Sequence, residues 1–273
     1  MSAAVPRDSA TVLLLRDGPA GVEVYLMRRV RGMPFAGGMT AYPGGSVDPR
    51  DAEPGLAWIG PPPAAWAAAF GAEEPTARAL VCAGVRETFE ETGVLLAGRP
   101  GAAPVVADTA EWDAVRRALH GGELSLAQAL TVRGLAVRAD LLRPWAHWVT
   151  PEVEPRRYDT WFFAAALPAG QRARDVSGEA ETAGWLRPAA ALTEYEDGAR
   201  PMLPPTVHTL RDLVPHRSVA SVLAAAPPGR LDVVRPLLVE HGGVQWVQLP
   251  DGSRVRPPVR LGPRPEPEPE PGE

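Results

Sequence analysis

An acidic stretch, Arg86-Glu87-Thr88-Phe89-Glu90-Glu91-Thr92-Gly93, constrains this chain more than any other part of its sequence. Residues 76–92 are rich in alanine, leucine, valine and arginine, contain no proline, and stop at Gly93, where a helix C-cap is expected. Successive residues of an α-helix turn by about 100°, so Glu87, Glu90 and Glu91 share one face. The sequence therefore predicts a helix over Thr76–Thr92 with three carboxylates on one side.

The side of this predicted helix opposite the glutamates can face a core. It carries Val81, Cys82, Val85, Thr88 and Phe89.

The acidic side needs a balancing partner. Like charges three and four residues apart on a helix repel one another by roughly a few tenths of a kcal/mol per pair. An acidic face is therefore usually solvated or balanced by a cation. Hard oxygen donors this close together suit Mg²⁺ or Mn²⁺, which take carboxylates and complete their shells with waters and substrate phosphates.

A glycine-rich segment upstream favours the metal interpretation over a solvated surface. It reads Tyr42-Pro43-Gly44-Gly45-Ser46-Val47-Asp48, at the end of a loop predicted over 37–45. Glycines let the backbone approach a metal or a phosphate closely. Together with the acidic helix, this segment resembles the Nudix box, G-x5-E-x7-R-E-U-x-E-E-x-G-U, where U is a bulky apolar residue. The matching positions are Gly45, Arg86, Glu87, Glu90, Glu91 and Gly93.

Two features depart from that box. Asp51 stands where the family has glutamate, and 34 residues rather than seven separate it from Arg86. Thr88 occupies a position that is usually more apolar. A box split by an insertion rich in proline and tryptophan is similar to one branch of the family, the peroxisomal coenzyme A diphosphatase type and its bacterial relatives. Further likeness at 148–151, 157–163 and 203–206 extends the resemblance over most of residues 10–215.

The resemblance implies an α+β fold: a Nudix-type α/β/α sandwich with a mixed sheet, a catalytic loop and helix, and inserted helical segments. We expect one Nudix hydrolase domain over 1–261. It would contain an insertion within the box at 52–75 and a helical insertion at 108–142. Residues 262–273 repeat proline and glutamate and are predicted to be a disordered tail.

Apolar periodicity and turn residues predict the remaining elements. Strands are expected at 9–15 and 22–28 around a turn at 17–19, and again at 145–150, 160–167, 181–186 and 244–249. Helices are expected at 64–70, in two or three pieces within 108–142, and at 188–192 and 207–213, with Ser125 and Gln128 forming a capping box. Trp58, Trp66 and Phe70 are expected to dock the insertion by packing, or else to line a pocket for an extended ligand.

The family resemblance also implies a divalent-metal-dependent hydrolase that cleaves a diphosphate linkage. Glu87, Glu90 and Glu91 are the expected catalytic and metal-ligating residues, with a backbone carbonyl near Gly44 as a further ligand for Mg²⁺ or Mn²⁺. Arg86 is expected to orient a neighbouring glutamate through an ion pair and to keep it ionised. Asp51 is a supporting candidate if it folds close to the helix.

The general base stays open among the three glutamates, and some Nudix enzymes recruit an acid from outside the box. Here each such acid can equally be a solvated surface group. The candidates are Glu152, Glu154, Asp159, Glu179 and Glu181.

Coenzyme A or an acyl-CoA is the substrate that the branch resemblance implies. The alternatives are a dinucleotide or a nucleotide sugar, or a catalytically silent module that senses a nucleotide. An intact set of three mutually repelling glutamates argues against the silent module. The tryptophan-bearing inserted helix could supply an apolar groove for the pantetheine arm. Expected substrate contacts are Gly44, Gly45, Arg28, Arg29 and Arg157, with Arg31 and Arg156 as further candidates.

Composition excludes several other classes of protein. The 273 residues are 45% hydrophobic, which allows a sizeable core, and no apolar run is long enough to span a bilayer. The net charge of −5 argues against nucleic acid as a partner. Cys82 is the single cysteine, so no internal disulfide can form, and the N-terminus lacks the layout of a signal peptide. We expect a cytoplasmic enzyme for a small-molecule diphosphate, with no membrane partner; its oligomeric state is open, a homodimer being one option.

Overall fold

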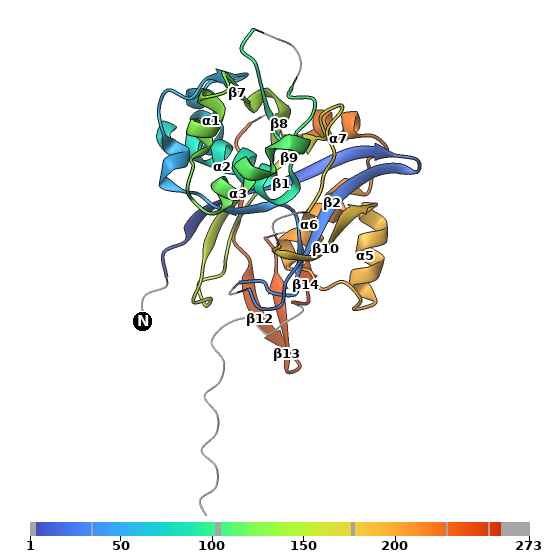
Figure 1. Ribbon diagram of the computed structural model, residues 1–273. Coiled ribbons are helices and arrows are strands. Elements are labelled where there is room, and N and C mark those ends of the chain that lie inside the picture. The colour runs from blue at the N-terminus through green and yellow to red at the C-terminus, as the bar shows by residue number, and fades with distance from the viewer. Residues whose placement is uncertain are drawn as a thin grey trace, which may run out of the picture.

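A mixed β-sheet runs through the middle of the computed structural model, which describes residues 4–33, 35–101, 105–175, 178–227, 229–250 and 252–257 (Figure 1). The strand order is β10-β2-β1-β9-β8-β11, with β3 beside β2 and β4 beside β1. Neighbours β1 and β9 are parallel, as are β8 and β11, and the other pairs are antiparallel. The strands are β1 (Arg7–Gly18), β2 (Gly21–Arg29), β3 (Thr40–Ala41), β4 (Gly44–Ser46), β8 (Leu142–Val149), β9 (Tyr158–Ala166), β10 (Ala180–Leu186) and β11 (Val233–Val234).

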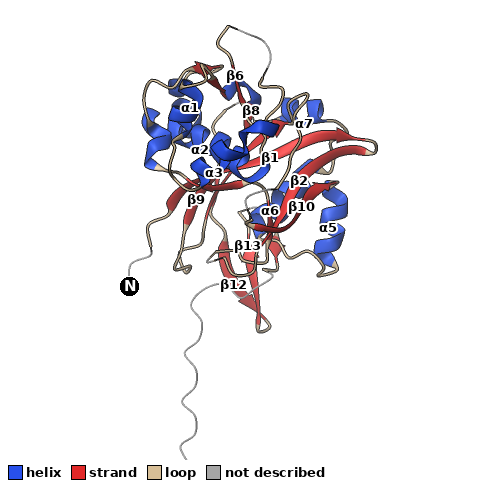
Figure 2. Ribbon diagram, viewed as in Figure 1, coloured by secondary structure: helices blue, strands red, loops and turns tan. Residues whose placement is uncertain are grey.

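Strand β1 is buried on both faces of the sheet, which explains why its sequence is a continuous apolar run and not an alternating one. Ala10 and Val12 belong to the core cluster on one face, and Leu13 and Leu15 to the cluster on the other. Helices cover both faces (Figure 2). The predicted α/β/α sandwich with a mixed sheet is confirmed.

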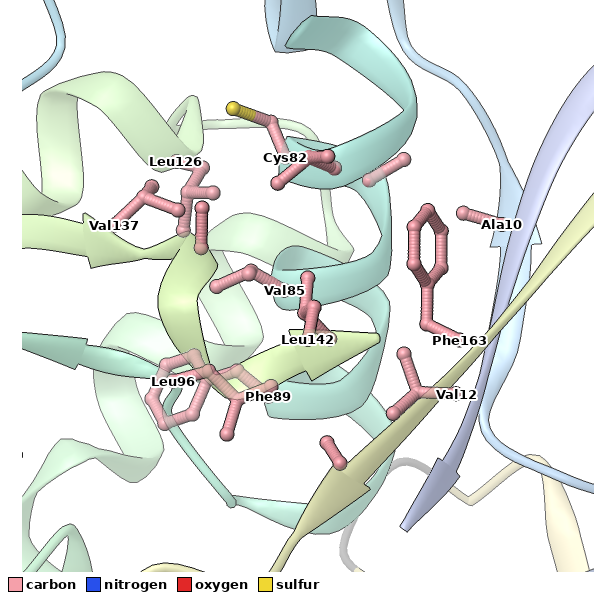
Figure 3. Packing of buried hydrophobic residues seen from close by; sticks show 14 of the residues in the cluster. Ala10, Val12, Cys82, Val85, Phe89, Leu96, Leu126, Val137, Leu142 and Phe163 are labelled. Carbon is pink, nitrogen blue, oxygen red and sulfur yellow. The ribbon is translucent and has the colours of Figure 1, made fainter. Parts of the chain in front are cut away.

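Helix α2 (Glu74–Thr92) covers the first face and carries the acidic stretch. Its apolar side, including Val85 and Phe89, packs among residues of β1 and β9 (Figure 3). The helix ends as predicted at Gly93, whose φ of 72° is left-handed and favours glycine. Thr88 is fully buried, and its hydroxyl donates to the Gly84 carbonyl at 2.7 Å, so a polar residue is accommodated at a usually apolar position.

The second face is covered by α5 (Pro188–Glu196), α6 (Pro204–Leu213) and α7 (Val219–Ala225). Val207, Leu210 and Leu213 of α6 pack into the same cluster as Leu13 and Leu15 of β1. The sequence predicted α5 and α6, but not α7. This helix is only seven residues long and is stabilised by a capping box at Ser218, which satisfies the backbone at its start.

The insertion within the box is packed into the first core. It follows η1 (Pro49–Ala52) and forms β5 (Trp58–Ile59) and α1 (Pro63–Phe70). Trp66 and Phe70 are buried and contact Phe163 of β9 at ring-centroid distances of 5.9 Å each. Of the two roles considered for these aromatic side chains, packing is confirmed.

The second inserted region is only partly helical. It contains η2 (Ala110–Trp112), α3 (Asp113–His120), α4 (Leu126–Thr131), and the predicted capping box of Ser125 and Gln128. Residues 136–138, expected to be helical, form strand β7 (Ala136–Arg138) between β5 and β6 (Ala97–Gly98), followed by η3 (Ala139–Leu141). The reason is tertiary: β5, which is distant in sequence, supplies the hydrogen-bonding edge that β7 pairs with.

A separate three-stranded sheet follows, made of β12 (Leu237–His241), β13 (Val244–Gln248) and β14 (Arg254–Val255). In Figure 1, β12 and β13 project from the main body. The strand predicted at 244–249 is β13. The proposed tail at 262–273 lies outside the described residues. Among the described helices, none combines the length and the apolarity needed to cross a membrane.

Replacing Trp66 with alanine tests whether the insertion contributes to the core. Loss of a buried tryptophan typically costs about 3–5 kcal/mol, so we expect Trp66→Ala to lower the free energy of unfolding by that order in a denaturant titration. Trp58→Ala is the matched control, because Trp58 is only partly buried and its indole also donates to Pro61. An equal, small loss in both variants would contradict the packing described here.

Candidate active site

The guanidinium of Arg86 joins the acidic helix to the glycine-rich segment. Its Nε and Nη2 donate to the two oxygens of Asp51 at 3.0 and 2.9 Å, and Nη2 also donates to the Ser46 carbonyl at 2.9 Å. Its Nη1 donates to Glu87 at 2.8 Å and Glu90 at 3.3 Å. Arg86 is only 9% exposed, so these partners satisfy a charge that water does not reach freely.

Asp51 returns to the helix despite the long insertion between them. It lies in η1, where Asp48 caps the turn and the Asp51 carboxylate accepts from the Asp48 amide at 2.9 Å. Asp51 is 3% exposed. The conditional prediction that Asp51 supports the site is therefore met in its geometry, and the shorter aspartate still reaches the arginine in a bidentate pair.

Two glycines of β4 lie against two of the glutamates. The amide of Gly44 donates to Glu91 Oε2 at 2.8 Å. A Cβ on Gly45 would collide with the carboxylate of Glu87, and a Cβ on Gly44 would lie 2.5 Å from the Ala10 carbonyl oxygen. These close approaches explain why this segment carries glycine at both positions.

Burial dominates the electrostatics of the three glutamates. It raises the pKa of Glu87 to about 7, and it raises the pKa of Glu90 and, further, that of Glu91, where the negative charge of Glu87 adds to the effect. The positive charge of Arg86 lowers the pKa of Glu87 and Glu90, but by less than burial raises it. The ion pair expected of Arg86 is present, and it favours the ionised form of Glu87 and Glu90 against the effect of burial.

A cavity of about 480 Å³ opens beside these groups. Glu87, Glu91, Gly44 and Gly45 line it, so the acidic helix and the glycine segment face one shared space. Another part of the lining, the apolar wall, consists of Trp148, Val149, Phe162, Leu203, Pro236 and Val247. A small-molecule site commonly has this mixture of apolar surface and a few convergent polar groups.

Arg29 is a predicted phosphate contact that lines the cavity. Its guanidinium lies 3.9 Å from Glu91 Oε1 and 3.9 Å from Glu179 Oε2. Glu179, one of the candidate acids outside the box, lines the cavity as well. Sequence reasoning missed His120, whose ring nitrogens lie 3.7 Å from Glu90 and 3.7 Å from Glu179. Only the fold of the second insertion brings His120 here, so no local pattern could have revealed it.

Other expected substrate contacts lie elsewhere. Arg28 lies 3.7 Å from Glu181, and neither lines the cavity. Arg157 donates to the backbone carbonyls of Thr150 and Ala4, while its neighbour Arg156 lines the cavity instead. Arg156 and Arg157 lie in the loop between β8 and β9, where no strand periodicity indicates which side chain faces the cavity.

The other candidate acids and the inserted aromatic residues also include some that line the cavity and some that do not. Glu154 lines the cavity, whereas Asp159 accepts a hydrogen bond from His147 Nε2 on the adjacent strand. The inserted tryptophan helix does not supply the groove expected of it: Trp58, Trp66 and Phe70 are absent from the lining. Their place in the core, against β9, explains this difference.

The donor set is suited to a divalent cation, although no three acidic, histidine or cysteine side chains of the described residues already form a metal-binding group. Glu87 and Glu91 are one helical turn apart, both face the cavity, and burial raises the pKa of both. A hard cation would offset their mutual repulsion. Glu90 is turned instead towards Arg86 and His120.

Comparison with known proteins agrees with this geometry. The family model described as the NUDT19 Nudix domain matches residues 64–213, more than half of the chain. This chain belongs to the Nudix hydrolase family. A Nudix hydrolase from Alicyclobacillus acidocaldarius has 29% sequence identity and a TM-score of 0.70, covering 83% of this chain and 99% of its own. The acyl-coenzyme A diphosphatase NUDT19 of Gallus gallus is 26% identical over 255 residues, covering 75% of this chain and 67% of that protein.

The predicted family, the fold class and the assignment as an enzyme are thus confirmed. Nudix enzymes bind small-molecule diphosphates and typically depend on a divalent metal. The matched region begins at residue 64 and so includes α2 with all three glutamates, while the Gly44-Gly45 segment and Asp51 lie before it. The contacts of Arg86 link those two parts of the site.

Substitution of the two glycines separates folding from activity. In Gly45→Ala the new methyl meets only the flexible end of Glu87, so we expect a melting temperature close to that of the unaltered Nudix hydrolase and a turnover at least tenfold lower. In Gly44→Ala the methyl meets the backbone of β1, so we expect a clear loss of stability. Thermal melts and kcat on the same samples check this; the reverse order of stabilities would contradict the placement of β4.

Proposed function

We propose that this Nudix hydrolase cleaves the diphosphate of coenzyme A or an acyl-CoA and depends on Mg²⁺ or Mn²⁺. The observation that carries the proposal is one cavity lined both by Glu87 and Glu91 and by an apolar wall. The acidic groups suit a metal–diphosphate, and the apolar wall suits a long organic substituent. The likeness to an acyl-CoA diphosphatase supports the same substrate class.

The residues around the cavity would have separate roles in positioning, metal binding and substrate binding. Arg86 and Asp51 hold Glu87 in place, and the Gly44 amide holds Glu91, so both carboxylates keep fixed positions before substrate arrives. Glu87 and Glu91, with the backbone at Gly44, would hold the metal ion, whereas Glu90, also expected as a ligand, is turned towards Arg86 and His120. When bound, that ion supplies charge neutralisation at the diphosphate and activation of the attacking water. Arg29 lines the same cavity and would contact a phosphate oxygen of the substrate.

A dinucleotide or nucleotide-sugar diphosphatase is the second candidate. Its substrates carry polar groups on both sides of the diphosphate, which would leave Trp148, Phe162 and Val247 in contact with polar atoms. A silent nucleotide sensor is less well supported, because a binding module has no need to bury carboxylates whose pKa values burial raises. The apolar wall therefore favours the coenzyme A class.

Glu91→Gln tests the metal assignment without relying on activity alone. Glutamine keeps the acceptor for the Gly44 amide but removes the charge, so the protein should fold. We expect turnover to fall by orders of magnitude, since metal coordination is worth several kcal/mol in the transition state. Mn²⁺ should raise the melting temperature of the unaltered protein and not that of the variant. A conserved Mn²⁺ shift in Glu91→Gln would contradict this ligand.

A panel of substrates tests the substrate class. With Mg²⁺ or Mn²⁺, coenzyme A should yield 3′,5′-ADP and a phosphopantetheine product, as read by chromatography of the nucleotide fragment. Dephospho-coenzyme A should be cleaved less efficiently, because cationic contacts to the 3′-phosphate are lost. Faster cleavage of NADH or ADP-ribose would leave the general diphosphatase and remove the coenzyme A assignment.

A further inference from the structure

The C-terminal part of the described chain contributes to the cavity that holds the acidic groups. Pro236 and Val247 line it, and both lie beyond residue 213, where the match to the family model ends. Strand β11 brings this part of the chain to the site by pairing with β8, where Val234 is the register partner of Trp148. The apolar wall is therefore completed by a segment that the matched Nudix region does not include.

The segment is held firmly enough to act as a wall. Val247 is 1% exposed and belongs to the same core cluster as Trp148 and Phe162, which also line the cavity. The far end of the small sheet is tied back by the hydroxyl of Tyr195, which donates to the Arg256 carbonyl at 2.7 Å. Because both ends of the segment are anchored on the main domain, the position of Val247 in the cavity is fixed by packing.

The two sides of the cavity come from different layers of the fold. Glu87 and Glu91 belong to α2, on the first face of the main sheet. Val247 belongs to the core cluster of the second face, together with α6. A substrate that meets both must extend from its diphosphate towards the apolar wall, beside which the lining also includes Thr150, Tyr158 and Thr206. A flexible, largely apolar substituent fits the apolar wall better than a second sugar or base does.

We propose that the sheet β12-β13-β14 is a specificity element, and that Val247 contacts the acyl chain of an acyl-CoA substrate. This inference deepens the proposed function and rests on it. Val247 is a binding residue for the acyl chain and takes no part in the chemistry, so its effect should depend on whether the substrate carries an acyl chain. The same nucleotide with and without a long acyl chain is therefore the informative pair of substrates.

The small sheet offers a matched control. Val255 is the cross-strand partner of Val247, is 2% exposed, and belongs to the same core cluster, but it does not line the cavity. Threonine is nearly the same size as valine and adds a hydroxyl. Val247→Thr places that hydroxyl in the apolar wall of the cavity. Val255→Thr places it in the same core cluster but away from the cavity lining. Val247→Phe is a second test that narrows the cavity without adding polarity.

The measurement is the ratio of kcat/KM for dodecanoyl-CoA to kcat/KM for free coenzyme A, taken on each variant with Mg²⁺. A ratio measured on one sample cancels any difference in folded fraction. We expect both Val247 variants to lower this ratio by roughly tenfold, the scale on which small changes in an apolar pocket discriminate substrates. Val255→Thr should leave the ratio within about twofold.

An unchanged ratio in both Val247 variants, with coenzyme A still cleaved, would overturn this inference and leave the proposed function intact. An equal shift in Val255→Thr would overturn it too, since general loosening of the sheet would then explain the effect. If the unaltered protein cleaves neither coenzyme A nor its ester, the proposed function fails and the role of Val247 fails with it.

Discussion

The ion pair between Arg86 and Asp51 is the interaction on which the site depends. It connects α2 to η1, two elements separated by the whole inserted segment, and both partners are almost fully buried. A buried pair of this kind is costly to break, because the remaining charge is left without water or a partner. The Nη1 atom of the same guanidinium donates to Glu87 and Glu90. A single side chain therefore fixes the position of η1 against α2 and the positions of two carboxylates.

The insertion adds to the core while leaving that interaction in place. Helix α1 packs its aromatic residues against β9, and β5 pairs with β7 from the second inserted region. The two insertions thus stabilise each other through a small sheet that neither could form alone. The second insertion also contributes a residue to the site, because α3 ends at His120, which lies beside Glu90 and Glu179.

The cavity combines three kinds of lining group from many parts of the chain. The acidic groups come from α2, the glycine segment from β4, and the apolar wall from β8, β9, the start of α6 and the C-terminal sheet. Membership of the Nudix family accounts for the acidic groups, since α2 lies inside the matched region. The apolar wall brings together residues from inside that region, such as Trp148 and Phe162, and residues beyond it, Pro236 and Val247.

The sequence by itself determined the elements whose signals are local. The helix ending at Gly93, the strands on either side of residues 17–19, the capping box at Ser125 and the acidic face of α2 follow from backbone preference and periodicity. Tertiary structure alone decided which side chains share a cavity. Arg29 and Arg156 face it while Arg28 and Arg157 do not, and β7 is a strand because β5 lies beside it. These outcomes depend on contacts between residues far apart in the chain, and no local pattern encodes such contacts.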